Sequence, residues 1–324
     1  MRHIFYSGLL LACVAFAGTS PAARAADWPT RPVSVVIPFP PGGTTDVIGR
    51  LMAQKLSQRL GQPFVVENRA GASGAIGTRH ALQSPPDGNT ILVVTTTTFS
   101  TYPATHPKTP YKVEQDAMPV INVAEVANVL MAHPGLKIKT LPQLLDYARK
   151  HPGDLDYGTP GAGSFAHLAI ELLGAKEKAQ FLHIPYKGAG PALNDAMGGQ
   201  IKVLFDQVPT TLAQIQAGKL VPIAVTSRQD SLPGVPTFEE QGVADYAPTI
   251  WYGLAVPAGT PPAIVDRLNR EANAILTDPD VKAQLQGQGA TAKGGTAQAF
   301  AAQVQADYAR WSEVSRAQHL QMED

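Results

Sequence analysis

Glycine and threonine residues near position 43 have the types and spacing that bind an anion. The prolines before them fix φ and lack an N–H donor, so they must end the apolar strand expected at 33–37. Gly42 and Gly43 let backbone approach a guest closely. The helix expected next, capped by Thr44 or Thr45, would present amides at its positive end to a carboxylate or phosphate. An ordinary strand-to-helix turn explains the same pattern. The candidate contacts are Pro40, Gly42, Gly43, Thr44, Thr45 and Asp46.

A second glycine-rich turn lies in the middle of the chain. It follows a strand expected at 155–158, and Ser164 is a natural cap for the next helix. Two such turns could present N–H groups to one guest from different domains. His167 either faces the crevice or is an ordinary core or surface histidine, and both interpretations stay open. The candidates here are Thr159, Gly161, Ala162, Gly163, Ser164 and His167.

Two further groups follow predicted strands. The strand expected at 90–94 runs into hydroxyls and an aromatic ring, where a sheet meets its ligand crevice, although threonine is also common in strands. Asp206 follows a strand expected at 201–205. It could orient a bridging water or accept from an ammonium group, and fixing a loop explains it equally well. These candidates are Thr96, Thr97, Thr98, Phe99 and Asp206.

Motifs for catalysis are missing from the sequence. Residues 71–75 break the G-x-S-x-G pattern at its last position, and neither G-x-x-x-x-G-K-[ST] nor H-E-x-x-H occurs. The glycines at 158, 161 and 163 do not form G-x-G-x-x-G, and the histidines are scattered without ligand-like spacing. We therefore expect no enzyme, no metal site and no cofactor.

The elements that must position these groups alternate between strand and helix. Further strands are expected at 64–67, 118–123, 129–133, 181–184 and 220–225, and three helices are expected between 261 and 319. This alternation predicts an α/β fold with parallel strand pairs.

Length, charge and the first residues narrow the class of protein. The 324 residues suffice for two domains. Residues 1–25 have the pattern of an export signal that ends in an A-x-A site before Ala26, although Cys13 lies in a lipoprotein-like box. Cleavage before Ala26 would leave no cysteine and two more acidic than basic residues. Nucleic acid and anionic lipid are therefore not expected partners.

These motifs, taken in order, resemble the Bug (TctC-like) family of solute receptors. PFPPGGTTD at 38–46, VVENR at 65–69, YGTPGAGSFAHL at 157–168 and WYGLAVPAGTP at 251–261 carry the resemblance. Each motif alone is weak, but together they span almost the whole mature chain. Shorter matches are PDG at 86–88, PYKG at 185–188, GGQ at 198–200, FD at 205–206 and AGKL at 217–220.

The resemblance implies a two-domain periplasmic binding protein of the Venus-flytrap type, with a hinge that the chain crosses twice. Domain 1 would comprise 26–124 and 226–324, and domain 2 would comprise 125–225. Such receptors serve the membrane subunits of tripartite tricarboxylate transporters, and we expect a periplasmic monomer. A ligand sensor that reports occupancy to a signalling partner is the alternative.

The resemblance also implies a class of ligand and the way it is held. The ligands are mostly small carboxylates, including amino acids and aromatic acids. A carboxylate would be held between the loops 40–46 and 159–167 by backbone and hydroxyl groups, often through water. Residues 95–99 depart from the family pattern, and Phe99 could favour an aromatic or longer apolar body.

Overall fold

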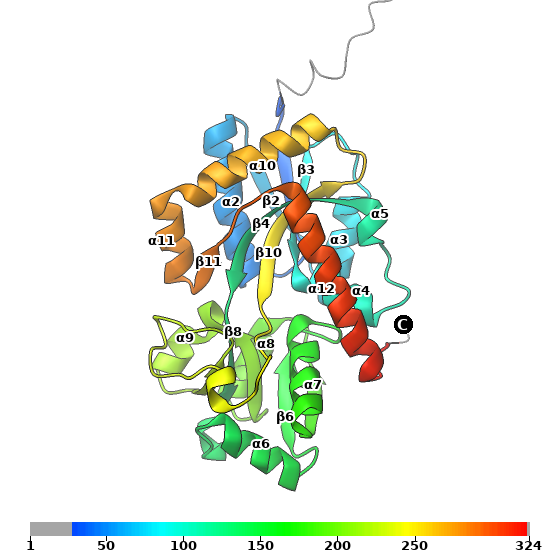
Figure 1. The fold of residues 1–324 in the computed structure, drawn as a ribbon. Helices are drawn as coiled ribbons and strands as arrows, with labels where there is room; N and C mark the ends of the chain where they lie inside the picture. Colours follow the sequence, from blue (N-terminus) through cyan, green and yellow to red (C-terminus); the bar gives the residue numbers. More distant parts are fainter. Residues whose placement is uncertain (1–27, 323–324) are drawn as a thin grey trace, which may run out of the picture.

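The computed structural model describes residues 28–322, so the predicted export signal and its cleavage before Ala26 lie outside it. The described chain forms two β-sheets flanked by helices, one above the other in Figure 1. We call each sheet with its helices a lobe. Within residues 28–322, no helix is long and apolar enough to cross a membrane.

The first lobe contains a six-stranded sheet. Its order is β11 (Ala290–Ala292), β4 (Ala117–Val126), β10 (Ile250–Pro257), β3 (Thr90–Thr95), β1 (Val33–Ile37) and β2 (Phe64–Asn68). β1 pairs in parallel with β2 and β3, whereas β10 is antiparallel to β3 and β4. The carboxyl ends of β1 and β3 therefore meet at one edge, which brings their following loops together.

The second lobe contains a five-stranded sheet. Its order is β7 (Phe181–Pro185), β6 (Leu155–Thr159), β8 (Val203–Gln207), β5 (Asn128–Ala132) and β9 (Val221–Val225). β6 is parallel to β7 and β8, and β5 is antiparallel to β8 and β9. The predicted α/β fold with parallel strand pairs is confirmed.

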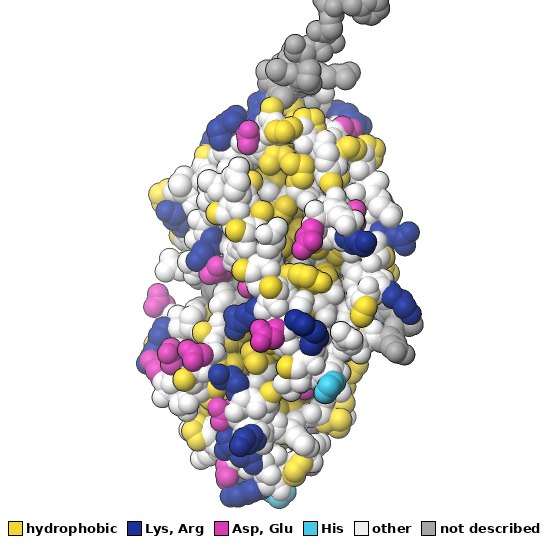
Figure 2. Space-filling view, turned by 45° about the vertical axis from the view of Figure 1, so that its right-hand side comes forward, with side chains coloured by type: hydrophobic (Ala, Val, Ile, Leu, Met, Phe, Trp, Pro, Cys, Tyr) yellow, Lys and Arg dark blue, Asp and Glu magenta, His cyan; other side chains and the backbone are white. Residues whose placement is uncertain are grey.

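Helices cover both sheets (Figure 1). Those of the first lobe are α2 (Thr44–Leu60), α3 (Ala75–Leu82), α4 (Tyr102–Thr105), α5 (Val113–Asp116), α10 (Pro262–Thr277), α11 (Pro279–Gly287) and α12 (Ala297–Ala317). Those of the second lobe are α6 (Leu141–Lys150), α7 (Phe165–Glu177), α8 (Ala189–Met197) and α9 (Val208–Gln216). Acidic and basic side chains are interspersed on the face shown in Figure 2, as the balanced composition suggests.

The main chain passes between the sheets twice, at Ala127 between β4 and β5 and through 226–249 between β9 and β10. The second connection packs on the second lobe, where the Tyr246 hydroxyl donates to the Ala169 carbonyl at 2.8 Å. The division into domains at residues 124 and 225 stays a prediction.

The strand β3 ends in a turn that the sequence pattern did not predict. The Thr95 amide donates to Thr98 Oγ1 at 3.1 Å, and the Thr98 amide donates to Thr95 Oγ1 at 3.3 Å. These two bonds stop the strand and start the short π-helical segment η2 (Thr97–Thr101). Successive threonines therefore point in different directions instead of forming one wall.

Candidate functional site

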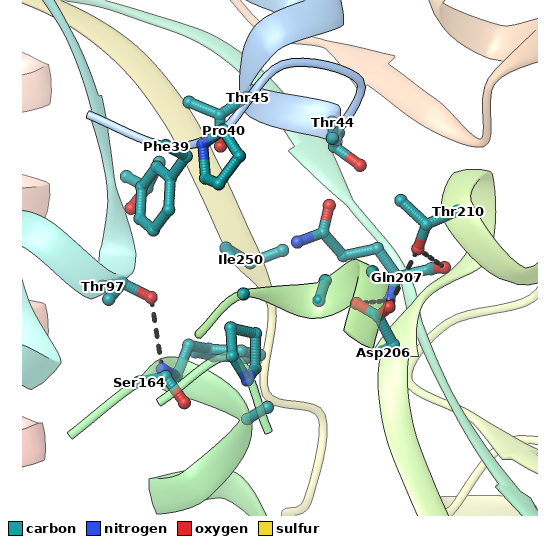
Figure 3. Close-up of a pocket in the computed structure, with 18 of the residues that line it drawn as sticks. Phe39, Pro40, Thr44, Thr45, Thr97, Ser164, Asp206, Gln207, Thr210 and Ile250 are labelled. Atoms are coloured by element: carbon teal, nitrogen blue, oxygen red, sulfur yellow. Dashed lines mark hydrogen bonds between the residues drawn. The ribbon is translucent and has the colours of Figure 1, made fainter. Parts of the chain in front are cut away.

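A cavity of about 710 Å³ lies between the two lobes. The β1–α2 loop and β10 form its first-lobe wall, and the start of α7, the loop before α8 and the β8–α9 junction form the opposite wall (Figure 3). Strand-to-helix turns thus converge here, as they do at ligand sites in open α/β sheets. The predicted contacts that line it are Pro40, Gly42, Gly43, Thr44, Thr45, Thr97, Ser164 and Asp206.

The start of α2 offers unused hydrogen-bond donors to the cavity. Gly43 occupies the N-cap position with φ −83° and ψ 170°, and no side chain caps the helix. The prediction of a Thr44 or Thr45 cap is therefore wrong. In the described chain, the amides of Gly43, Thr44 and Thr45 donate no hydrogen bond, and the buried Thr44 hydroxyl has no partner. Donors at this positive helix end favour an anion.

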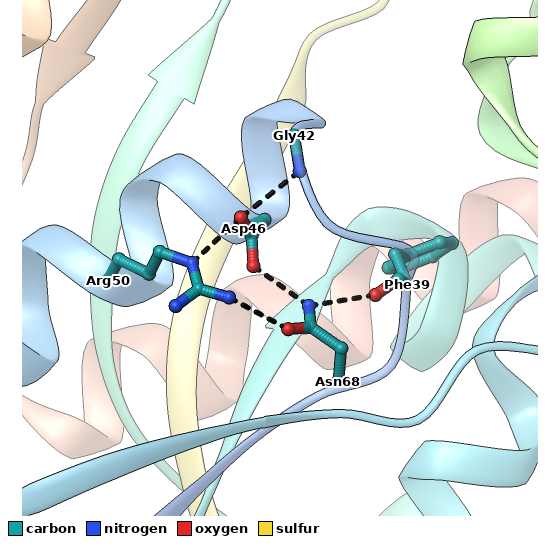
Figure 4. A network of polar contacts seen from close by, with 5 residues as sticks. All are labelled: Phe39, Gly42, Asp46, Arg50 and Asn68. Atoms are coloured by element: carbon teal, nitrogen blue, oxygen red, sulfur yellow. Dashed lines mark hydrogen bonds and ion pairs between the residues drawn. The ribbon is translucent and has the colours of Figure 1, made fainter.

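Asp46 lies outside the cavity lining and holds the loop from behind (Figure 4). Its Oδ2 accepts from the Gly42 amide at 3.1 Å and from Arg50 Nε at 2.9 Å, and its Oδ1 accepts from Asn68 Nδ2 at 2.8 Å. Burial alone would raise the pKa of Asp46, but these hydrogen bonds and the Arg50 charge lower it. Arg50 was recognisable from its i,i+4 spacing to Asp46, whereas Asn68 comes from β2 and gave no local signal.

The second glycine-rich loop uses its donors within the protein. The Gly161 amide donates to Thr159 Oγ1 at 3.3 Å, and the Gly163 amide donates to His167 Nδ1 at 3.2 Å. Ser164 caps α7 as predicted, because its hydroxyl accepts from the His167 amide. Thr159, Gly161, Ala162 and Gly163 do not line the cavity, and Ser164 does.

His167 is a core histidine that supports this loop rather than a cavity residue. It is 4% exposed, and its ring stacks on His183 with centroids 3.8 Å apart. Burial, followed by the charges of His183 and His106, lowers the pKa of His167 to about 3, and burial lowers that of His183 to about 4. His183 Nε2 lies 2.6 Å from Thr159 Oγ1. Two neutral rings therefore hold the loop in place.

Of the four candidates after β3, only Thr97 lines the cavity. Thr96 Oγ1 accepts from the Trp251 amide at 2.9 Å, and Thr98 bonds back to Thr95. Phe99 is fully buried and faces a separate cavity near α12. The turn into η2 explains these positions, because it rotates each side chain relative to the one before.

Asp206 closes one side of the cavity together with groups that the sequence analysis missed. Its Oδ1 accepts from the Gln207 amide at 2.8 Å, and its Oδ2 accepts from Thr210 Oγ1 at 3.1 Å. Burial raises the pKa of Asp206 to about 6, although these two hydrogen bonds oppose the shift. The Tyr252 hydroxyl donates to Gln207 Oε1 at 2.6 Å, which fixes the Gln207 amide at the cavity edge.

Lys187 is the one cationic side chain among the described residues that line the cavity. It is exposed and follows β7, in the PYKG motif at 185–188. The sequence analysis includes this motif in the family resemblance but predicts no site role for its lysine. Its place after a parallel strand, like that of Gly42 after β1, was the available signal.

Three hydrogen bonds join the lobes at the margins of the cavity. Ser73 Oγ donates to the Ala162 carbonyl at 3.0 Å, and the Phe165 amide donates to Thr97 Oγ1 at 3.2 Å (Figure 3). The bond from Tyr252 to Gln207 is the third. The walls are thus held close to each other on more than one side.

Comparison with known proteins identifies the family. The sequence profile of the "Tripartite tricarboxylate transporter family receptor" matches residues 48–320. The chain belongs to this receptor family. It is 37% identical to Protein BugT of Bordetella pertussis, over 94% of each chain.

Solved structures support the same receptor assignment. Periplasmic binding protein BugD superposes with a TM-score of 0.84 at 32% identity, covering 91% of this chain and 100% of that one. An R. palustris protein solved with adipate gives 0.86 at 35% identity, covering 90% and 98%. The chain therefore has the two-domain periplasmic binding protein fold, and it is a solute receptor rather than an enzyme.

Proposed function

We propose that this receptor captures a small carboxylate in the periplasm for the membrane subunits of a tripartite tricarboxylate transporter. The main support is the set of unused hydrogen-bond donors at the start of α2. These donors are three backbone amides and the buried Thr44 hydroxyl, and they line a cavity between the two lobes. The adipate bound to the R. palustris relative agrees with this class of ligand. Both walls come from one chain, so a monomer suffices for binding.

The donors are sufficient for useful affinity without a buried cation. Hydrogen bonds to a charged group contribute about 1.5–3 kcal/mol each, and a partly buried helix end contributes up to about 2 kcal/mol. Micromolar binding requires about −8 kcal/mol, which three such donors can supply.

The test is a thermal-shift screen with mono-, di- and tricarboxylates and aromatic acids, followed by calorimetry of the hits. A ligand at a hundred times its Kd should stabilise the protein by about 2.7 kcal/mol. The matching amides should bind far more weakly, since they lack the charge. Equal binding of acid and amide, or preference for phosphate, would contradict the proposal. Co-purification with the membrane subunits in the presence of the hit tests the transport partner.

A further inference from the structure

Asp206 is the one acidic side chain that lines the cavity among the described residues. It is only 5% exposed, and no ion pair of residues 28–322 includes it. Its charge is stabilised by two donors, the Gln207 amide at Oδ1 and the Thr210 hydroxyl at Oδ2. Buried acids are usually paired with a cation. This carboxylate is therefore poorly protected against a second negative charge in the cavity.

The other ionisable groups nearby do not compensate the charge of Asp206. Lys187, the one cationic side chain on the described cavity lining, is exposed to water. Tyr252 stays neutral, because burial and then the charge of Asp206 raise its pKa. Asp46 lies behind the α2 loop and is paired with Arg50, and no histidine of residues 28–322 lines the cavity. Asp206 is therefore the group whose protonation an incoming anion would change most.

A proton can be added to Asp206 with little change in its surroundings. The Thr210 hydroxyl has a second acceptor, the Gln207 carbonyl at 2.9 Å. Rotation of the hydroxyl toward that carbonyl releases Oδ2 to carry the proton, while Oδ1 keeps the Gln207 amide. The protonated carboxyl is then a donor as well as an acceptor, so it can donate to an anion.

A carboxylate at the start of α2 would enter the same cavity. Figure 3 shows Thr44 and Asp206 on walls that face each other across it. Two negative charges repel more strongly in a partly enclosed site than in water, and this repulsion disfavours the ionised form of Asp206. Burial already raises the pKa of Asp206 to about 6, so a bound anion would raise it further toward neutral pH.

We propose that the receptor takes up a proton together with its carboxylate, and that Asp206 holds this proton. The proton comes from the solvent and forms an O–H bond at Oδ2, so it neutralises the added negative charge within the cavity. The inference rests on the proposed function, since it requires a carboxylate in the cavity. It holds for acids with one or several carboxylates, because it requires only an anion close to Asp206.

Calorimetry in buffers with different enthalpies of ionisation counts the protons taken up on binding. The carboxylates of the screen, beginning with adipate, are titrated at pH 7, and the tightest binder is then measured from pH 6 to pH 8.5. Wild type should take up about half a proton or more per bound acid at pH 7. Its affinity should rise about 10-fold from pH 8.5 to pH 6, because binding raises the pKa of Asp206 further.

Asp206→Asn separates proton binding from a structural role. Asparagine is neutral at every pH and resembles the protonated residue in shape, so the variant should take up no proton and should lose the pH dependence. Its affinity should match wild type within threefold at pH 6 and exceed it about 10-fold at pH 8.5. A purely structural Asp206 would instead make the variant weaker at every pH. Asp230→Asn, at an exposed position outside the cavity, is the matched control and should keep the wild-type proton uptake.

Infrared difference spectra of wild type test the proposal without any variant. A band of a protonated carboxyl should appear when the acid binds at pH 7, and its absence would overturn the inference. Binding without proton uptake, or parallel pH profiles of wild type and Asp206→Asn, would overturn this inference alone. Failure of every acid to bind would overturn the proposed function and this inference with it.

Discussion

The two glycine-rich loops look equivalent in the sequence but have different tasks in the structure. Each follows a parallel strand and starts a helix of its lobe. At α2 the amides of Gly43 and Thr44 have no protein acceptor, whereas Gly163 and Phe165 donate to His167 and Thr97. The amides of the first loop are therefore free to bind a ligand. The amides of the second loop instead stabilise the second lobe and its contact with the first lobe.

The largest effect is expected from Gly43→Val. A Cβ at Gly43 meets nothing within 4 Å and its φ is negative, so the fold should be unaffected. The added side chain would instead block the approach of a guest to the free amides. We expect affinity for the screened carboxylate to fall about 10- to 150-fold, the value of one charged hydrogen bond of about 1.5–3 kcal/mol. Gly234→Val, equally open and remote from the cavity, is the control, and an unchanged affinity for Gly43→Val would remove the first loop from the site.

In the second loop, Gly163→Ala should damage stability more than binding. Gly163 has φ +69°, and a Cβ there would come within 2.5 Å of Thr105 Oγ1 and 2.7 Å of the His106 ring. Strain and overpacking should lower the free energy of unfolding by about 1–3 kcal/mol, seen as a drop of several degrees in Tm. Calorimetry should find the affinity within threefold of wild type. A folded variant with wild-type Tm and no binding would reverse the roles assigned to the loops.

Acid should act on the second loop before the first. Since the pKa values of His167 and His183 are lowered from the ordinary 6.5, their contribution to stability is complete above pH 6.5 and is lost as the pH falls toward 4 and 3. Urea unfolding should be measured at pH 6.5 and pH 4 for wild type and for His183→Gln. The free energy of unfolding should fall less in the variant than in wild type, by at least about 1 kcal/mol. His106 faces the same pair and is unchanged in both proteins. Parallel pH profiles would contradict this origin of the acid sensitivity.

The smallest effect is expected at Lys187. Its ammonium is exposed, and water and salt screen such a charge. Lys187→Met should slow association of the carboxylate by threefold or less in stopped-flow fluorescence, with a similarly weak dependence on salt between about 10 and about 150 mM. Lys219→Met, an exposed lysine after α9 that does not line the cavity, is the control for the loss of one surface charge. A tenfold change would make a cation, rather than the helix amides, the main anchor.

The sequence was sufficient for most strands and long helices, and for the strand, stop and helix start around the first loop, because these depend on neighbours in the chain; the N-cap itself is Gly43 rather than a threonine. Proline, glycine and threonine around position 43 specify a strand, a stop and a helix start within a few residues. Which amides form hydrogen bonds within the protein could not be predicted, because their acceptors lie far away in the sequence. Phe165 meets a hydroxyl 68 residues away, and Asp46 is held by Asn68, 22 residues away.

The threonine cluster after β3 shows the same limit in another form. A continuing strand would alternate its side chains between two faces, whereas the sequence analysis predicts all four candidates on one wall of the crevice. The mutual bonds of Thr95 and Thr98 replace that strand with a turn, so Thr97 is the one predicted candidate of this group that lines the cavity, beside Thr95. The hydrogen bond between Tyr252 and Gln207 could not be predicted either, because the two residues are 45 positions apart in the sequence.

The last helix, α12, contacts both lobes and is therefore expected to resist opening of the cavity. α12 packs along the first lobe through Phe300 against Trp251, yet Trp311 contacts the Phe165 ring of the second lobe edge to face, with centroids 5.6 Å apart. Opening has to move an indole across a phenyl ring, which adds resistance that the two chain crossings alone would not provide. The resting balance of open and closed receptors is thereby set partly by a residue that no solute meets. Trp311→Ala should increase the radius of gyration of the unliganded protein in small-angle scattering, and an unchanged radius would locate that resistance elsewhere.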